Sequence, residues 1–245
     1  MKLAKLRSDL NERLEKKPEL KRTITAISKL EWIESSYDFD TAYTREGEPL
    51  YAEEIQQIIK GEYLDSKTVR DHIMVRNYYD MIKYVYGVLS LKDMTDLSLM
   101  ERINRILCRD EMLREKEDIY RKSVPIVKEF AMVPPHHQTV GEELNKVIKN
   151  YNIMHSQLDP ILRGCFIHNE FLRAYPFKEN NEATARALLN FELLSGGLLP
   201  LAFFMEKEEY RACVRRHINN NDPKPFFEMI LKEEKKIYAR FLEMN

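Results

Sequence analysis

Apolar residues recur at intervals of three and four along most of this chain, the spacing that places side chains on one face of an α-helix. Segment 66–90 keeps this pattern until Gly87, and in segment 49–62 Leu50, Ile55 and Ile58 share one face. Only seven glycines and ten prolines interrupt the 245 residues, which are rich in strong helix formers. The sequence therefore predicts a mainly α-helical fold.

Several further helices are expected. Segment 95–110 begins at Thr95 or Asp96, either of which can cap a helix, and Thr139 is expected to cap segment 140–157. Two strongly apolar helices are expected at about 157–174, a range that includes the Asp159-Pro160 pair near its start, and at about 183–195. They flank the short loop "YPFKENNE".

Segment 120–139 does not follow the helical pattern. β-Branched and aromatic residues lie here between Pro125 and the Pro134-Pro135 pair, a context that suits extended backbone. The sequence predicts one short β-hairpin at about 124–133.

Composition limits the classes of function. The net charge of -1 gives no global attraction to nucleic acid or to an anionic membrane. Three cysteines, Cys108, Cys165 and Cys213, match no zinc or redox spacing and suggest a reducing compartment. The charged N-terminal sequence does not resemble a signal peptide, and no apolar run is long enough to cross a bilayer. We expect one cooperative unit in the cytoplasm, with no nucleic-acid or membrane partner.

The loop "AYPFKENNEATAR" at 174–186 allows two interpretations. It leads into a helix N-terminus, whose free N–H groups can bind phosphate, with Glu179 holding Mg²⁺ and Asn181 and Arg186 contacting the anion. Alternatively, Asn180 and Asn181 form a plain turn, Glu182 favours the helix dipole, and Arg186 pairs with a surface carboxylate.

The same loop resembles the signature of the Fic (Fido) family, H-P-F-x-[D/E]-G-N-G-R-x-x-R, without a gap. The matching residues are Pro176, Phe177, Glu179, Asn181 and Arg186. Outside the loop, the resemblance includes His168 and Phe171, the pair Tyr120-Arg121, and Val133-Pro134-Pro135 at the family's target-binding flap. In total it covers roughly residues 50–231. It implies a Fic-like helical core at 50–231 around a central helix-loop-helix, with a C-terminal helix end at 232–245. By resemblance, the activity is transfer of AMP from ATP, with Mg²⁺, to a protein hydroxyl.

This sequence departs from the signature at the residues that carry out catalysis and bind phosphate in the family. Tyr175 replaces the histidine base, and a phenol with a pKa of about 10 is a poor base at pH 7. Asn180 and Glu182 replace two glycines, and Ala183 replaces the first arginine. A carboxylate about 4 Å from a phosphate costs up to roughly 4 kcal/mol. The resemblance thus implies a cofactor site at Asn180, Asn181, Glu182 and Arg186 with a metal ligand at Glu179, but impaired catalysis at Tyr175.

Residues 1–49 are expected to form an N-terminal helical extension. Family members often carry an inhibitory motif, [S/T]-x-x-x-E-[G/N], whose Glu bonds the second signature arginine. Ser36 and Asp40 have the required spacing, although Asp replaces Glu. The alternative is that Ser35-Ser36 simply caps a helix.

Three functions remain open. The first is a Fic-family protein with impaired adenylyl transfer. The second is a non-enzymatic binding module that holds a protein or peptide at the flap (about 124–133) through main-chain hydrogen bonds. One variant of this module is a homo-oligomer. In that case Asn180 holds the turn, and Glu182 favours the helix N-terminus or pairs with Arg186. The third is a divergent transferase that uses another nucleotide donor, or that uses His136 or His137 as its base. His168, in contrast, is expected to be buried and structural.

Overall fold

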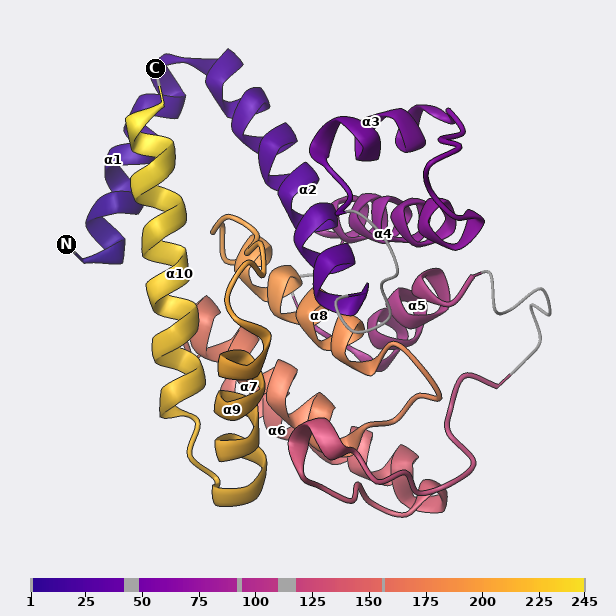
Figure 1. Cartoon of the computed structure of the whole chain (residues 1–245). Coiled ribbons are helices and arrows are strands. Elements are labelled where there is room, and N and C mark those ends of the chain that lie inside the picture. Colours follow the sequence, from indigo (N-terminus) through magenta and orange to yellow (C-terminus); the bar gives the residue numbers. More distant parts are fainter. Residues whose placement is uncertain (1, 42–48, 92–93, 110–117, 156, 245) are drawn as a thin grey trace.

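The computed structural model describes residues 2–41, 49–91, 94–109, 118–155 and 157–244 (Figure 1). The described part of the chain is mainly helical. Its first helices are α1 (Leu3–Lys16), α2 (Pro18–Thr41), α3 (Ala52–Lys60), α4 (Val69–Val88) and α5 (Leu97–Leu107). The later ones are α6 (Val140–Met154), α7 (Pro160–Ala174), α8 (Asn181–Ser195), α9 (Lys207–Asn220) and α10 (Lys224–Glu243).

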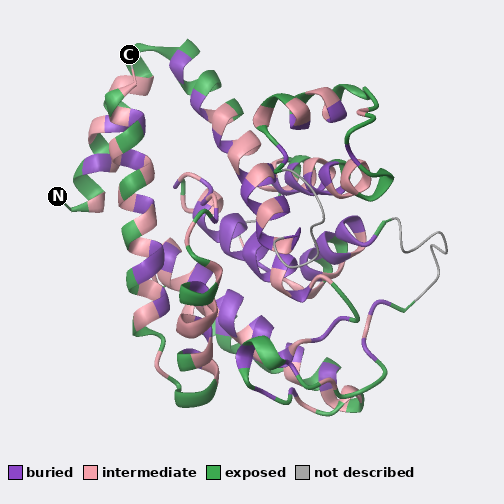
Figure 2. Ribbon diagram, viewed as in Figure 1, coloured by how far each residue is buried: buried purple, intermediate pink, exposed green. Residues whose placement is uncertain are grey.

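Helices α7 and α8 form the centre of the molecule and are buried on most sides (Figure 2). Asp159 caps α7 by accepting the N–H groups of Ile161 and Leu162, and Pro160 occupies the first turn, where it needs no donor. At the other end of the pair, a Cβ on Gly196 would lie 2.0 Å from the Pro160 side chain. Only glycine allows the end of α8 to approach the start of α7 this closely.

The other helices surround this pair. Helix α1 packs along α10, and α2 runs from the top of the molecule to the N-terminal half of α8 beside α4 (Figure 1). Arg7 of α1 donates to the Gly196 carbonyl at 2.9 Å, and Arg13 donates to the Leu242 carbonyl at 2.6 Å. The first helix therefore satisfies the free carbonyls at the ends of α8 and α10.

Several helix ends differ from the sequence-based expectation. Helix α7 begins at Pro160 rather than near 157, and α8 begins at Asn181 rather than at 183. Asp96 caps α5 as expected, accepting the Leu99 N–H at 2.7 Å. Thr139 precedes α6 but makes no side-chain cap, because its hydroxyl donates to the His136 carbonyl and completes a 3₁₀ turn, η2 (His137–Thr139).

The expected β-hairpin at 124–133 is not confirmed. In the described part of the chain this segment holds a single antiparallel bridge, between Val127 and Met132, and no strand is assigned. A 3₁₀ turn, η1 (Lys128–Phe130), and left-handed Ala131 close the bridge. Pro125 and Pro134 flank it and lack the N–H groups that a longer ladder requires. We call residues 122–135 the flap.

The division into 1–49, 50–231 and 232–245 stays a prediction. Helix α2 ends at Thr41 within the first segment, and α10 runs through 231 and 232 without a break. Among the described residues, no helix combines the length and apolarity needed to span a bilayer.

Glu234 of α10 makes stability depend on pH. Its side chain is fully buried, neither carboxylate oxygen has a partner among the described residues, and burial raises its pKa from 4.5 to about 8. The folded chain thus keeps this proton at pH values where the unfolded chain releases it. The free energy of unfolding should fall by up to about 1.4 kcal/mol per pH unit as pH rises through this window.

Urea unfolding of the native chain and of Glu234→Gln between pH 5 and pH 8 tests this prediction. The free energy of unfolding of the native chain should fall relative to that of Glu234→Gln as pH rises, because the two chains share all other titrating groups. Parallel pH profiles would contradict the assignment of a buried, protonated Glu234.

Candidate functional site

The loop between α7 and α8 begins and ends in left-handed backbone. Tyr175 has φ 43° and follows the last residue of α7, while Asn180 has φ 56° and precedes α8. Asparagine adopts this conformation readily, so Asn180 can stand where the family has glycine. The expectation that Asn180 holds the turn is confirmed, and tyrosine is the less usual residue in this conformation.

Asn181 fixes the loop from inside. Its side-chain oxygen accepts the Phe177 N–H at 3.0 Å, and its amide nitrogen donates to the Phe177 carbonyl at 2.9 Å. Asn181 is buried, so this pair of bonds satisfies both ends of the amide away from water. The side chain thus orients the loop backbone.

Helix α5 supports the loop from one side. Asn104 donates to the Glu179 carbonyl at 2.9 Å and to the Thr184 hydroxyl at 3.2 Å, and Asn180 donates to the Cys108 sulfur at 3.1 Å. The sequence analysis did not identify Asn104 or Cys108 as site residues. Asn104 lies on the apolar face of a predicted helix, and a polar residue at such a position was the available signal.

Segment 119–121 supports the loop from the other side. The Lys178 N–H donates to the Ile119 carbonyl at 2.9 Å, and the Arg121 N–H donates to the Pro176 carbonyl at 3.1 Å. The Arg121 side chain is buried and donates to the carbonyls of Tyr175 at 2.7 Å, Ser123 at 2.9 Å and Pro135. Arg121 therefore joins both arms of the flap to the end of α7.

Arg186 is fully buried and is bound by the N-terminal extension. One of its terminal nitrogens lies 2.7 and 2.8 Å from the two carboxylate oxygens of Asp40, near the end of α2. Burial is the largest single influence and lowers the pKa of Arg186, but the charges of Asp40, Tyr210, Tyr78 and Glu182 together outweigh it and raise the pKa above its ordinary value. Tyr78 of α4 also donates to Asp40. The Asp40–Arg186 contact is the one that the inhibitory motif implies.

Ser36 lies one turn before Asp40, buried inside α2, so the alternative in which Ser35-Ser36 caps a helix is wrong. The Arg186 guanidinium stacks 4.3 Å from the centroid of the Phe39 ring, and Lys207 lies 4.9 Å from the same ring and donates to the Phe39 carbonyl. Cations thus hold the last turn of α2 through both the ring and the backbone.

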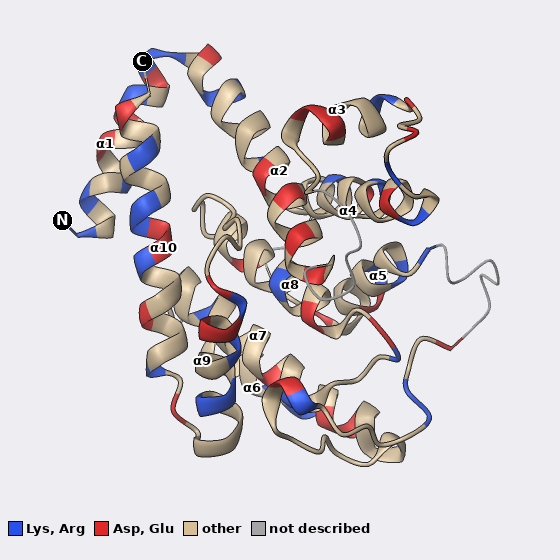
Figure 3. Cartoon of the chain, viewed as in Figure 1, with Lys and Arg blue, Asp and Glu red and all other residues tan. Residues whose placement is uncertain are grey.

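Glu182 lies in the first turn of α8, as expected, but it does not pair with Arg186. Its carboxylate lies 2.8 Å from Arg211 of α9. Arg186 is instead paired with Asp40 of α2. Figure 3 shows acidic residues along the second half of α2, beside α8, and both acidic and basic residues on α9. Arg211 was not identified from the sequence, where nothing in its surroundings distinguishes it from other surface arginines.

Tyr175 is partly buried, whereas Glu179 is exposed. Burial, and then the charge of Glu182, raises the pKa of Tyr175 to about 12, so the phenol keeps its proton at neutral pH. Glu179 is exposed, and only its backbone carbonyl takes part in the loop network. Among the described residues, no three His, Cys, Asp or Glu side chains gather as a metal site.

His168 is buried as expected. Its Nδ1 lies 2.8 Å from the Asn169 side-chain oxygen, and its Nε2 lies 2.9 Å from the Tyr210 hydroxyl. Burial lowers the pKa of His168 to about 3, so the ring is neutral and structural. His136 and His137 lie at the end of the flap with their rings 4.2 Å apart, which leaves their proposed role as a base a prediction.

Comparison with known proteins agrees with this geometry. Residues 93–193 match the model of the Fic/DOC family. The protein adenylyltransferase fic-1 of Caenorhabditis elegans is 25% identical over 204 residues, which cover 80% of this chain and 39% of the relative. The chain therefore spans well under half the length of that relative.

Solved structures show the same fold. A Fic domain-containing signaling protein from Bacteroides thetaiotaomicron matches with a TM-score of 0.81 at 16% identity, over 98% of this chain and 95% of that one. IbpAFic2, solved in complex with adenylylated Cdc42, matches with a TM-score of 0.51 at 16% identity, over 97% and 87% of the two chains. The match of residues 93–193 to the Fic/DOC family model, together with these relatives and the shared fold, confirms the resemblance found in the sequence.

Proposed function

We propose that this chain is a Fic-family protein in which adenylyl transfer has been lost and that it acts as a protein-binding module. The observation that carries the proposal is the buried Asp40–Arg186 pair beside a loop that has Tyr175 at the position of the catalytic histidine. The first feature removes an anion-binding arginine, and the second removes the base.

The residues present do not fit ATP with Mg²⁺ in the family's usual pose. Arg186 already binds a carboxylate, the small, buried Ala183 stands where the family has its other arginine, and Glu182 brings a negative charge to the loop. Arg211 pairs with the Glu182 carboxylate within the protein, so this arginine does not need a bound phosphate to balance its charge. Glu179 remains a candidate metal ligand by resemblance alone.

Tyr175 cannot take the role of the histidine. A phenol with a pKa of about 12 is protonated at neutral pH and does not accept a proton from a target hydroxyl. Loss of a positioned base lowers a rate typically 10²–10⁴-fold. The missing phosphate contacts add to this factor.

Binding of a protein partner does not need these groups. The flap is held by backbone and arginine contacts that involve neither the Tyr175 side chain nor a nucleotide. IbpAFic2 was solved with a protein partner on the same fold. A flap of this kind can hold an extended peptide through main-chain bonds after the chemistry has disappeared.

Transfer of label from α-³²P-ATP to proteins of a cell lysate tests the proposal. We expect no labelled band with the native chain at pH 7.5 in the presence of Mg²⁺. Transfer that Glu179→Ala abolishes would contradict the loss of activity. Parallel reactions with other labelled nucleotides test the remaining candidate, a transferase with another donor, and robust transfer in these would also contradict the proposal.

A further inference from the structure

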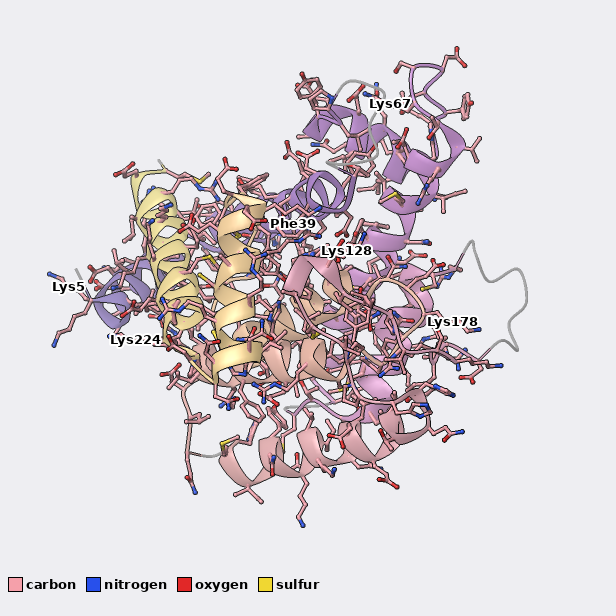
Figure 4. The ribbon with its side chains drawn as sticks, turned by 60° about the horizontal axis from the view of Figure 1, so that its bottom comes forward. Lys5, Phe39, Lys67, Lys128, Lys178 and Lys224 are labelled. Atoms are coloured by element: carbon pink, nitrogen blue, oxygen red, sulfur yellow. The ribbon has the colours of Figure 1, made fainter. Side chains whose placement is uncertain are left out.

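Helix α9 has a buried side and a polar side. The buried side packs into the core through Tyr210 and Val214. The polar side carries a residue with a long or amide side chain at every fourth position, namely Lys207, Arg211, Arg215 and Asn219. In the view of Figure 4, Phe39 of α2 and Lys128, the first residue of η1, lie on the side of α9 away from α10. Helix α9 thus runs past both the end of α2 and the flap.

The first turn of α9 holds the end of α2 through Phe39. The Phe39 ring meets the Tyr210 ring edge to face, with centroids 4.9 Å apart and an interplanar angle of 82°. Lys207 lies 4.9 Å from the same ring and donates to the Phe39 carbonyl. Phe39 directly precedes Asp40, so these contacts also position the carboxylate that pairs with Arg186.

The later turns of α9 hold the closing turn of the flap. Arg215 donates to the Glu129 carbonyl at 2.9 Å, and Asn219 donates to the Phe130 carbonyl at 3.2 Å. Both carbonyls belong to η1, which closes the bridge between the two arms. The position of the closing turn therefore depends on α9.

The two sets of contacts stabilise one cooperative element. Phe39 makes no hydrogen bond, ion pair or ring contact with the flap in the described part of the chain; its ring partners are Phe203, Tyr210, Arg186 and Lys207. A helix opens cooperatively, so contacts at its first turn and at its last turn favour the same docked state. Loss of one set lowers the stability of the helix that supports the other.

We propose that α9 links the last turn of α2 to the flap, so that withdrawal of Phe39 from α9 loosens the flap. Because such a coupling free energy is reciprocal, a partner that tightens the flap also holds the end of α2 against α8. This linkage is a regulatory device that goes beyond the proposed binding function. It governs how well the flap is ordered in the free chain, whichever partner the flap holds.

Hydrogen exchange followed by mass spectrometry on the full chain tests the linkage. Phe39→Leu keeps an apolar side chain but removes the ring contacts with Lys207, Tyr210 and Arg186. We expect peptides that cover 122–135 to exchange about five- to tenfold faster, the factor for loss of one or two such ring contacts. The matched control is Phe241→Leu, at a buried ring of α10 that stacks on Arg240 at 4.7 Å, and it should leave exchange of the flap unchanged.

A double variant in α9 tests the route of the coupling. Arg215→Ala with Asn219→Ala should itself speed exchange of the flap and, by reciprocity, exchange of residues 35–41. Phe39→Leu added to this variant should cause no further increase at the flap. Unchanged flap exchange in Phe39→Leu would overturn the inference. The same increase with and without the α9 substitutions would also overturn it, because the coupling would then pass through α8 and Arg121.

Exchange is measured on the free chain, without nucleotide or partner. Failure of the linkage therefore leaves the proposed binding function untouched, and detection of nucleotide transfer would contradict the proposed loss of activity without affecting the exchange result.

Discussion

Asp40→Ala should lower the free energy of unfolding by about 3–5 kcal/mol, the range for removal of one partner from a buried ion pair. The variant leaves the Arg186 guanidinium charged and without its carboxylate, in a place where only 1% of the residue is exposed. It also leaves the Tyr78 hydroxyl without its acceptor. Urea unfolding at pH 7 measures the change.

A double-mutant cycle separates the ion pair from the packing. Asp40→Ala combined with Arg186→Met should recover part of the stability lost by Asp40→Ala, because the second substitution removes the uncompensated charge. Glu34→Ala on the same helix serves as the control and should change stability by less than about 1 kcal/mol. An Asp40→Ala variant as stable as the control would show that the pair does not hold α2 to α8.

Arg121→Ala should cost about 3 kcal/mol of stability and should free the flap. The arginine donates to the carbonyls of Tyr175, Ser123 and Pro135, and each hydrogen bond from a charged donor is worth about 1.5–3 kcal/mol before relaxation. Without it, water must reach these carbonyls, which requires that the two arms separate.

Hydrogen exchange followed by mass spectrometry measures this release. Peptides that cover 122–135 should exchange faster in Arg121→Ala, while those that cover α10 should not change. Arg121→Lys should fall between the variant and the native chain, because an ammonium group cannot reach three separated carbonyls at once. Unchanged exchange at the flap in Arg121→Ala would contradict the role of this residue.

The helical core was predictable because its signals are local. The apolar periodicity of α4, α5, α7 and α8 records a buried face in the sequence itself, and Asp96 and Asp159 mark helix starts through their own side chains. The hairpin prediction was not confirmed because β-branched composition fits any extended segment. Whether such a segment forms a ladder depends on a partner strand, and the flanking prolines remove the donors for one.

The candidate site was predictable only where a residue acts inside its own segment. Asn180 and Asn181 shape the loop that contains them, so sequence position indicated their roles. The partners of Glu182 and Arg186 could not be assigned this way, because Arg211 and Asp40 come from helices distant in the chain. Position i+4 favoured a Glu182–Arg186 pair, but Arg186 pairs with Asp40 of α2 and Glu182 pairs with Arg211 of α9.

Isothermal titration calorimetry with ATP·Mg²⁺ tests the central claim most directly. The account predicts no binding to the native chain at millimolar nucleotide, because its own side chains occupy the phosphate-binding groups of the loop. A variant with Tyr175→His, Glu182→Gly and Ala183→Arg should gain binding when Asp40→Gly is added to release Arg186, with circular dichroism as a check that it folds. Micromolar binding of ATP·Mg²⁺ to the native chain would contradict the claim that the loop is closed to nucleotide.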